Sequence, residues 1–293
     1  MRWLHHIATE PFELPDRYEP ESLAKEGFAH CSLKGEVRES ARLYFAGIPP
    51  ERLRVLRIDP RRLDVPVRFD DTPRGPMPHV YGATPRDAVA EVIALDAIDR
   101  APDEVRGTRF AIVGFARMTL LDLVGVYDPL SRIASMGIDS SSSVEIVSAT
   151  PEPWQGGGAK LAASRVRPKL GEFDVVVVAG GAETRKLRED PGILSWLGRF
   201  PHNRLIASVC TGALLLGASG RLQGKRATTH QSEIASLAAY GATAIRERVV
   251  DEGQLVTAGG VTSALDLGLH LVARLYGEDA RRSIADRMEF TQK

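Results

Sequence analysis

The sequence predicts a doubly wound α/β domain with a flavodoxin-like sheet, preceded by a small α+β domain. From Arg109 onward, apolar β-type runs alternate with helical patterns, which is typical of α/β folds. The run at 173–179 is continuously apolar, as in a parallel strand covered on both faces. Before it, short alternating strands and short helices indicate an α+β module. The polar stretch 101–108 contains Pro and Gly, so we place the domains at 1–104 and 105–293.

The N-terminal elements follow from local patterns. The stretch 53–59 alternates as a strand does, and 37–46 puts its apolar residues on one side of a helix. Pro20 starts a helix that ends at Gly27, and Pro85 is acceptable in the first turn of another. The predicted strands are 3–8, 53–59 and 65–69, and the predicted helices are 20–27, 37–46 and 85–98.

The C-terminal elements alternate in type. The predicted strands are 110–115, 144–149, 173–179 and 205–209, followed by a hairpin of 245–250 with 254–257. The predicted helices are 120–136, which we expect Pro129 to break, 231–240 and 262–276. The serines at 140–143 and the glycines at 156–158 are expected in a loop and a turn.

Composition excludes several classes of protein. The 293 residues carry 38 Lys plus Arg and 38 Asp plus Glu, so nothing favours nucleic acid or an anionic membrane. No apolar run is long enough to span a membrane, and the N-terminus lacks the pattern of a signal peptide. Two cysteines without zinc-type spacing indicate free thiols, no metal site and a reducing, cytoplasmic location.

The segment around Cys210 has the pattern of a nucleophile elbow. An apolar strand, 205–209, breaks at Cys210, and a helix former follows at once in Ala213-Leu-Leu-Leu. A helix N-terminus aimed at the sulfur lowers a thiol pKa. We therefore predict that Cys210 is a nucleophile held as a thiolate.

Two other segments end strands at the same edge of the sheet. Gly180 and Gly181 follow the most buried strand and are expected to offer backbone amides to an oxyanion. Asp122 lies near the start of the first helix, as a proton-transferring carboxyl or a helix N-cap. His230 either lines the pocket or caps the helix from Gln231, and the sequence leaves both readings open.

Five motifs follow one another in the span from about 109 to 290. They are Leu121-Asp-Leu-Val-Gly, Val178-Ala-Gly-Gly, Ser208-Val-Cys-Thr-Gly-Ala-Leu-Leu-Leu-Gly, Arg226-Ala-Thr-Thr-His and Thr257-Ala-Gly-Gly-Val-Thr-Ser-Ala-Leu-Asp-Leu-Gly-Leu. By these motifs the span resembles the PfpI-type, glutamine-amidotransferase-like superfamily, especially its isonitrile hydratase-like branch. Thr211 follows the cysteine as in the hydratase-like branch, where the peptidase-like branch has histidine. Ala179 departs from the Pro that many relatives carry.

The resemblance implies a small-molecule substrate and site roles by position. Cys210 would be the nucleophile, Asp122 the acid/base and Thr211 a hydrogen-bonding neighbour, converting an isocyanide to an N-substituted formamide without a cofactor. Other thiol activities of the superfamily (glyoxalase, deglycase, amidase) remain alternatives, as does a non-enzymatic metabolite- or redox-sensing module. Relatives are commonly dimers, so a homodimer is expected. Some relatives add a C-terminal DNA-binding module, for which we expect no room after Lys293.

Two motifs of the N-terminal domain are Glu26-Gly-Phe-Ala-His-Cys-Ser and Pro78-His-Val-Tyr-Gly-Ala-Thr. By these motifs the domain resembles an uncharacterised bacterial family, domain-of-unknown-function family 952. The fold of that family is similar to that of ADP-ribosyltransferases, which suggests binding of NAD or another nucleotide. The candidate pocket residues are His6, His30, Ser32, His79 and Tyr81, each of which has a core or turn role as its alternative. Cys31 is expected to be buried rather than reactive.

Overall fold

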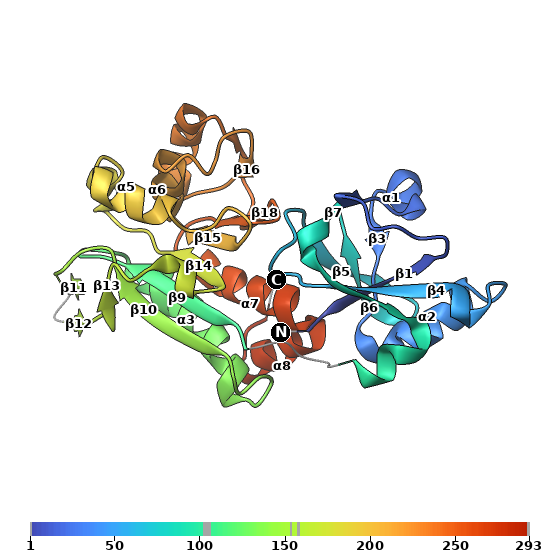
Figure 1. The fold of residues 1–293 in the computed structure, drawn as a ribbon. Coiled ribbons are helices and arrows are strands. Elements are labelled where there is room, and N and C mark those ends of the chain that lie inside the picture. Colours follow the sequence, from blue (N-terminus) through green and yellow to red (C-terminus); the bar gives the residue numbers. More distant parts are fainter. Residues whose placement is uncertain (1, 102–106, 153, 157–158, 292–293) are drawn as a thin grey trace. The chain divides into compact units, whose positions relative to one another are not determined.

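The structure is a computed structural model that describes residues 2–101, 107–152, 154–156 and 159–291 (Figure 1). The chain separates into two compact units, the first formed by residues 1–106 and 273–279 and the second by 107–272 and 280–293. The predicted boundary near residue 104 lies outside the described residues, as do Gly157 and Gly158 of the glycine run.

The second unit is built on a seven-stranded sheet in the order β13-β10-β9-β14-β15-β19-β18. All neighbours are parallel except β18 and β19, which form the antiparallel pair at one edge. The five central strands follow the flavodoxin-like order 2-1-3-4-5, as predicted. The strands are β9 (Arg109–Gly114), β10 (Ser143–Ser148), β13 (Arg165–Val166), β14 (Val175–Val178), β15 (Leu205–Val209), β18 (Val249–Asp251) and β19 (Leu255–Ala258).

The three helices predicted at 120–136, 231–240 and 262–276 are present, with further helices between and after them. The helices of the second unit are α3 (Leu120–Ser135), α4 (Thr184–Leu187), α5 (Pro191–Gly198), α6 (Gly212–Ala218), the 3-10 helix η6 (Gln231–Tyr240), α7 (Ser263–Tyr276) and α8 (Glu278–Arg287). The predicted break at Pro129 is wrong, because α3 continues through it. Pro129 is buried and lies against Gly268, where an added β-carbon would stand 2.9 Å from its Cγ. Close packing against α7 compensates for the backbone hydrogen bond that proline cannot make.

Two small strand pairs, a 3-10 turn and a hairpin complete the description of this unit. β11 (Trp154–Gly156) pairs antiparallel with β12 (Ala159–Leu161), and β16 (Arg226–Ala227) pairs with β17 (Thr243–Ala244). The short 3-10 helix η5 spans Leu170–Glu172. The predicted hairpin near residue 250 is present, with its first strand moved to β18.

The first unit contains two three-stranded antiparallel sheets, β1-β4-β8 and β3-β6-β5, and the pair β2-β7. Its strands are β1 (Leu4–Thr9), β2 (Arg17–Tyr18), β3 (Ala29–His30), β4 (Leu53–Ile58), β5 (Val67–Thr72), β6 (Gly75–Val80), β7 (Thr84–Pro85) and β8 (Val89–Ala94). Its helices are α1 (Glu21–Glu26) and α2 (Val37–Tyr44), with 3-10 turns η1 (Lys34–Glu36), η2 (Pro50–Arg52), η3 (Arg86–Ala88) and η4 (Leu95–Arg100).

The predicted helix 85–98 is wrong. Its centre is strand β8, which pairs antiparallel with β4. Val89, Val92 and Ile93 are β-branched and favour a strand, and the exposed edge of β4 supplies backbone hydrogen bonds that a helix would leave unused. Among the described residues, no helix has the length and apolar character needed to cross a membrane.

Candidate active site at Cys210

Cys210 occupies a strained corner between β15 and α6. Its φ is +54°, a left-handed conformation that costs free energy for any residue with a β-carbon. Its backbone N–H reaches the carbonyl oxygens of Ala258 and Gly259 at 3.0 and 2.9 Å, which fixes the corner against the end of β19. Gly212 must be glycine, because a β-carbon there would stand 2.3 Å from the Val178 carbonyl oxygen. The predicted nucleophile elbow is therefore present in the backbone.

Asp122 faces Cys210 from the first turn of α3. Its side chain is fully buried, and one carboxylate oxygen, Oδ2, accepts the Gly180 N–H at 3.1 Å. The other oxygen, Oδ1, has no hydrogen-bond partner among the described residues. Burial raises the pKa of Asp122 to about 6, although hydrogen bonds from the Cys210 thiol and the Gly180 amide oppose the rise. A carboxyl with such a pKa can both take up and give back a proton near neutral pH.

The prediction that Cys210 is held as a thiolate is wrong. Burial and then the negative charge of Asp122 raise the pKa of Cys210 to about 11. The backbone N–H groups of Thr211 and Val261 donate to the sulfur and lower the pKa, but they do not outweigh those two effects. At neutral pH the pair is therefore a thiol beside a carboxylate, holding one proton between two acidic groups.

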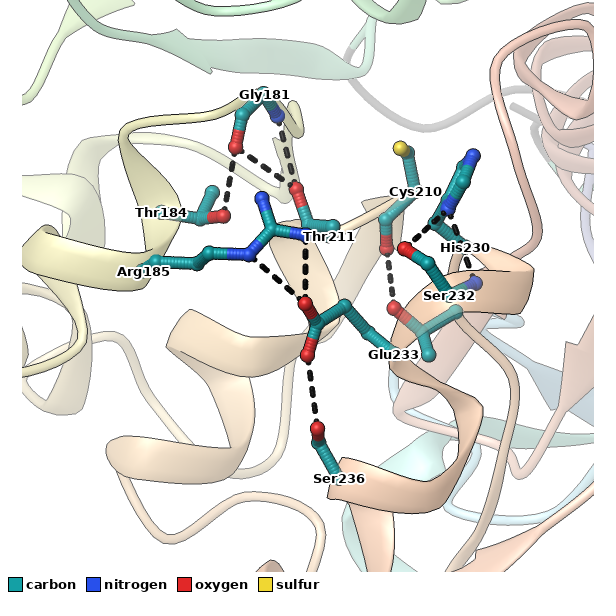
Figure 2. A network of polar contacts seen from close by, with 10 residues as sticks. Gly181, Thr184, Arg185, Cys210, Thr211, His230, Ser232, Glu233 and Ser236 are labelled. Atoms are coloured by element: carbon teal, nitrogen blue, oxygen red, sulfur yellow. Dashed lines mark hydrogen bonds and ion pairs between the residues drawn. The ribbon is translucent and has the colours of Figure 1, made fainter.

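The backbone N–H groups of Gly180 and Gly181, the predicted oxyanion donors, already donate hydrogen bonds within the protein. The Gly180 N–H holds Asp122, and the Gly181 N–H donates to the Thr211 hydroxyl at 2.9 Å. Thr211 in turn donates to the Gly181 carbonyl oxygen at 3.0 Å, so its side chain locks the glycine loop (Figure 2). Both amides, which we expected to be offered to an oxyanion, are therefore already hydrogen-bonded within the protein. The donors aimed at the sulfur are instead the amides of Thr211 and Val261. Val261 was missed, because a backbone donor leaves no side-chain signal in a sequence.

His230 caps the 3-10 helix η6. Its Nδ1 accepts the Ser232 N–H at 3.2 Å and lies 2.8 Å from the Ser232 hydroxyl. With Nδ1 as acceptor, the neutral ring carries its proton on Nε2. The far edge of the ring lies against Gly260, the residue before the sulfur donor Val261. Figure 2 shows the ring and the Cys210 sulfur projecting in the same direction. The cap is therefore established, and it leaves Nε2 directed away from η6.

The 3-10 helix η6 is linked to α4 by an ion pair between Glu233 and Arg185, which the sequence did not reveal. Arg185 Nε donates to Glu233 Oε1 at 2.8 Å, and Ser236 donates to the other oxygen of Glu233 at 2.8 Å (Figure 2). Thr184, the residue before Arg185, donates to the Gly181 carbonyl oxygen at 2.7 Å. The glycine loop and the cap at His230 are thus held by one polar network.

An apolar cavity of about 280 Å³ opens at the same edge of the sheet, over the ends of β9 and β10. Its apolar lining includes Phe115, Met118, Ile146, Trp154, Leu161 and Val166. The Trp154 indole N–H donates to the Met118 carbonyl oxygen at 2.5 Å, and Met118 pairs with Gly181 through a β-bridge. The cavity wall and the glycine loop of the cysteine site therefore share one segment of backbone.

The five candidate residues of the first unit do not form one pocket. His6 is buried, with Nδ1 donating to the His30 carbonyl oxygen at 2.7 Å and Nε2 2.9 Å from the Tyr18 hydroxyl. Burial lowers the pKa of His6 to about 4, so it is a neutral structural residue. Ser32 is buried against Ser40, with their hydroxyls 3.0 Å apart. His30, His79 and Tyr81 lie together on one face of the sheet β3-β6-β5.

The second cysteine has the predicted character. Cys31 is free and buried, and burial raises its pKa to about 12. Within the described part of the chain, no three His, Cys, Asp or Glu side chains gather closely enough to hold a metal ion.

Sequence comparisons agree with the division into two units. The profile of domain-of-unknown-function family 952 (DUF952) matches residues 7–92. An isonitrile hydratase from Pseudomonas putida is 35% identical over 179 residues, which are 60% of this chain and 75% of the hydratase. Protein DJ-1 homolog A of Arabidopsis thaliana is 26% identical over 57% of this chain and 45% of its own length.

Solved structures share the fold of the second unit. A THiJ/PfpI family protein from Pseudomonas syringae superimposes with a TM-score of 0.56 at 29% identity, covering 64% of this chain and 76% of that protein. DJ-1 from Schizosaccharomyces pombe gives a TM-score of 0.52 at 18% identity, covering 62% of this chain and all of the yeast protein. The profile of the DJ-1/PfpI family matches residues 109–274, more than half of the sequence. The chain therefore belongs to the DJ-1/PfpI family, with a DUF952 domain before the family domain.

Proposed function

We propose that the second unit is a cysteine-dependent hydratase that adds water to isocyanides and releases N-substituted formamides. The observation that carries the proposal is the buried pair of Cys210 and Asp122, which holds one proton and has no imidazole as its immediate neighbour in the chain. The 35% identity to an isonitrile hydratase supports the same substrate class.

In the first step, the S–H bond of Cys210 breaks as the sulfur bonds to the terminal carbon of the isocyanide. Asp122 takes the thiol proton and passes it to the same carbon, so the triple bond becomes the C=N bond of a thioimidate. A preformed thiolate is unnecessary, because the proton that leaves sulfur is the proton that carbon needs. The Thr211 and Val261 amides stabilise negative charge as it develops on the sulfur.

In the second step, water adds to the thioimidate carbon. Asp122 accepts a proton from the water and gives it to the substrate nitrogen, which leaves an N–H group. The C–S bond then breaks, the hydroxyl proton returns to sulfur through Asp122, and the formamide C=O bond forms. Cys210 and Asp122 end in their starting protonation states, so the cycle uses this chain's own residues without a cofactor.

The cavity beside Met118 suits a small apolar substituent. The substituent of an isocyanide is an uncharged organic group, and this cavity of about 280 Å³, which is lined by residues other than the pair, is linked to the site through the bridge between Met118 and Gly181. We assign His230 to the border of the cysteine site, where its ring lies against Gly260 and its Nε2–H would be available to a polar atom of the substrate. Thr211 is a positioning residue, since its hydroxyl is bonded to both backbone groups of Gly181.

We also infer that the working protein is a homodimer, as expected from the resemblance to dimeric relatives. Light scattering of the full chain tests this point independently of activity. A monomer at assay concentration would contradict it.

Turnover of cyclohexyl isocyanide by the full chain tests the proposed function, with formamide measured by chromatography. We expect Cys210→Ala and Asp122→Asn to lower kcat/KM by about a thousandfold or more, and Cys31→Ala, the matched cysteine control, to retain activity. Parallel assays with an α-oxoaldehyde and with a primary amide distinguish the glyoxalase, deglycase and amidase alternatives. Wild-type turnover by Cys210→Ala would exclude the mechanism, and no turnover of any of these substrates would favour a sensing module.

A further inference from the structure

The sheet β3-β6-β5 of the first unit has one face in the core and one face turned away from it. The core face carries Ala29, Val67 and Val80, which belong to a buried apolar cluster. Because side chains alternate along a strand, the opposite face receives their neighbours. These neighbours form what we call the ring face, defined by Phe28, His30, Arg68, Asp70, His79 and Tyr81.

The side chains of the ring face are in direct contact. Phe28 stacks on His79 with centroids 4.2 Å apart and planes inclined by 25°. His30 lies 5.0 Å from both Phe28 and His79, edge to face, and Tyr81 lies 5.4 Å from Phe28. The outer face of an antiparallel sheet ordinarily carries separate polar residues. A continuous group of four rings on such a face indicates a surface for another flat ring.

His79 is held in a defined orientation within this group. Its Nδ1 lies 2.6 Å from Asp70 Oδ2, and the Tyr81 hydroxyl donates to the same oxygen at 2.6 Å. Since a carboxylate only accepts, the neutral His79 carries its proton on Nδ1 and has a free lone pair on Nε2. No described residue hydrogen-bonds to that Nε2. The site therefore presents an oriented, uncommitted hydrogen-bond acceptor beside the stacked rings.

Arg68 gives the ring face an available positive charge. Its guanidinium lies 4.7 Å from the centroid of the Tyr81 ring and is otherwise exposed. No carboxylate of a described residue comes within ion-pair distance of it. In the antiparallel register, Arg68 is directly opposite His79, and His79 is directly opposite His30. An anion held by Arg68 would thus lie next to the rings and to His79.

We propose that the ring face binds a free nucleotide. The flat base would stack on the half-buried rings of Phe28 and Tyr81, and its phosphate would pair with the exposed Arg68. A ribose hydroxyl or base N–H would donate to the Nε2 of His79. The proposal is independent of the chemistry at Cys210. It keeps His30, His79 and Tyr81 from the candidates named in the sequence and adds Phe28, Arg68 and Asp70.

Calorimetric titration of the full chain tests the proposal, with AMP, NAD, adenosine and inorganic phosphate as separate probes. We expect at least one of the two nucleotides to bind, and adenosine and phosphate each to bind at least tenfold more weakly than it does. Arg68→Gln should weaken nucleotide binding about tenfold. Arg42→Gln, an exposed arginine on α2, is the matched control and should leave binding unchanged. Cys210→Ala should also leave it unchanged.

Phe28→Leu keeps an apolar side chain but removes the stacking surface, and we expect it to weaken nucleotide binding while leaving phosphate binding unaltered. Circular dichroism verifies that each variant is folded, and the NMR signal of the His79 ring should shift when nucleotide is added. Absence of binding by both nucleotides would overturn the proposal. An equal loss of nucleotide affinity in Arg68→Gln and Arg42→Gln would also overturn it. So would inorganic phosphate that binds as tightly as the nucleotides.

Discussion

Gly180 stands so close to Asp122 that a β-carbon on residue 180 would lie 2.8 Å from the carboxylate oxygen Oδ2. The same carbon would be 2.8 Å from Cys210 Cβ and 2.6 Å from the Thr211 nitrogen. The absence of a side chain at this position is therefore what allows the carboxyl and the thiol to meet.

Gly180→Ala should consequently separate the pair. We expect kcat/KM to fall by about a hundredfold or more and the free energy of unfolding to fall by about 1–3 kcal/mol, because the site is overpacked. Gly171→Ala is the matched control, since a β-carbon there would have nothing within 4 Å. Turnover and urea denaturation measure both effects, and an active Gly180→Ala protein would contradict the assignment of the pair.

The pH dependence of turnover should reflect the pair. The pKa of Asp122 is raised to about 6, so below this pH the carboxyl is protonated and cannot take the thiol proton. We expect kcat/KM to rise about tenfold per pH unit up to about 6 and then to stay level through pH 9. A further rise between pH 8 and 9 would instead indicate that the reaction needs a preformed thiolate.

Alkylation of the thiol separates its reactivity from catalysis. In a Cys31→Ala background, iodoacetamide should react with Cys210 slowly at pH 8 and faster toward pH 11, since the pKa is raised to about 11. Asp122→Asn removes the negative charge that contributes to the rise. This variant should therefore be alkylated faster than the parent at pH 8 while losing turnover. Slower alkylation would show that Asp122 does not raise the pKa of the thiol.

Thr211→Val should loosen the glycine loop. The substitution keeps the shape of the side chain but leaves the N–H and carbonyl groups of Gly181 without the Thr211 hydroxyl. We expect a loss of about 1–3 kcal/mol in the free energy of unfolding and reduced kcat. Thr211→Ser retains the hydroxyl and should restore most of both quantities, which distinguishes the hydrogen bonds from packing of the methyl group.

Filling the cavity beside Met118 should alter substrate preference. Ala163 lines this cavity, and Ala163→Trp should raise KM for cyclohexyl isocyanide about tenfold or more while leaving methyl isocyanide unaffected. Ala235→Trp, at an exposed position on η6, controls for the added indole. If Ala163→Trp raised KM equally for both isocyanides, the substituent would not bind in this cavity.

Features encoded locally could be predicted from the sequence. The corner at Cys210 is marked by an apolar strand that meets a helix former within three residues, and Asp122 is marked by its place in the first turn after the first strand. The continuously apolar run of β14 identified a strand buried on both faces of a parallel sheet.

Features that depend on the assembled fold were missed. The pKa of Cys210 is set by burial and by Asp122, which lies 88 positions earlier in the chain, whereas the sequence showed only the nearby helix end. Asp70 joins His79 only through the register of β5 with β6. Strand β8 was mistaken for a helix. Its β-branched residues favour a strand, but the pairing with β4 that stabilises this strand cannot be read from the segment alone.

The single proton shared by Cys210 and Asp122 has an electrostatic consequence for the proposed cycle. Thiol and carboxylate together carry one negative charge, and thioimidate and carboxylate carry the same charge. The buried site would therefore pass through its covalent intermediate without gaining or losing net charge. A low-dielectric interior penalises changes of charge far more than movements of a proton between neighbours. Burial disfavours the thiolate of resting Cys210 by raising its pKa, but it does not disfavour the covalent intermediate to a comparable extent, because the net charge of the site is unchanged.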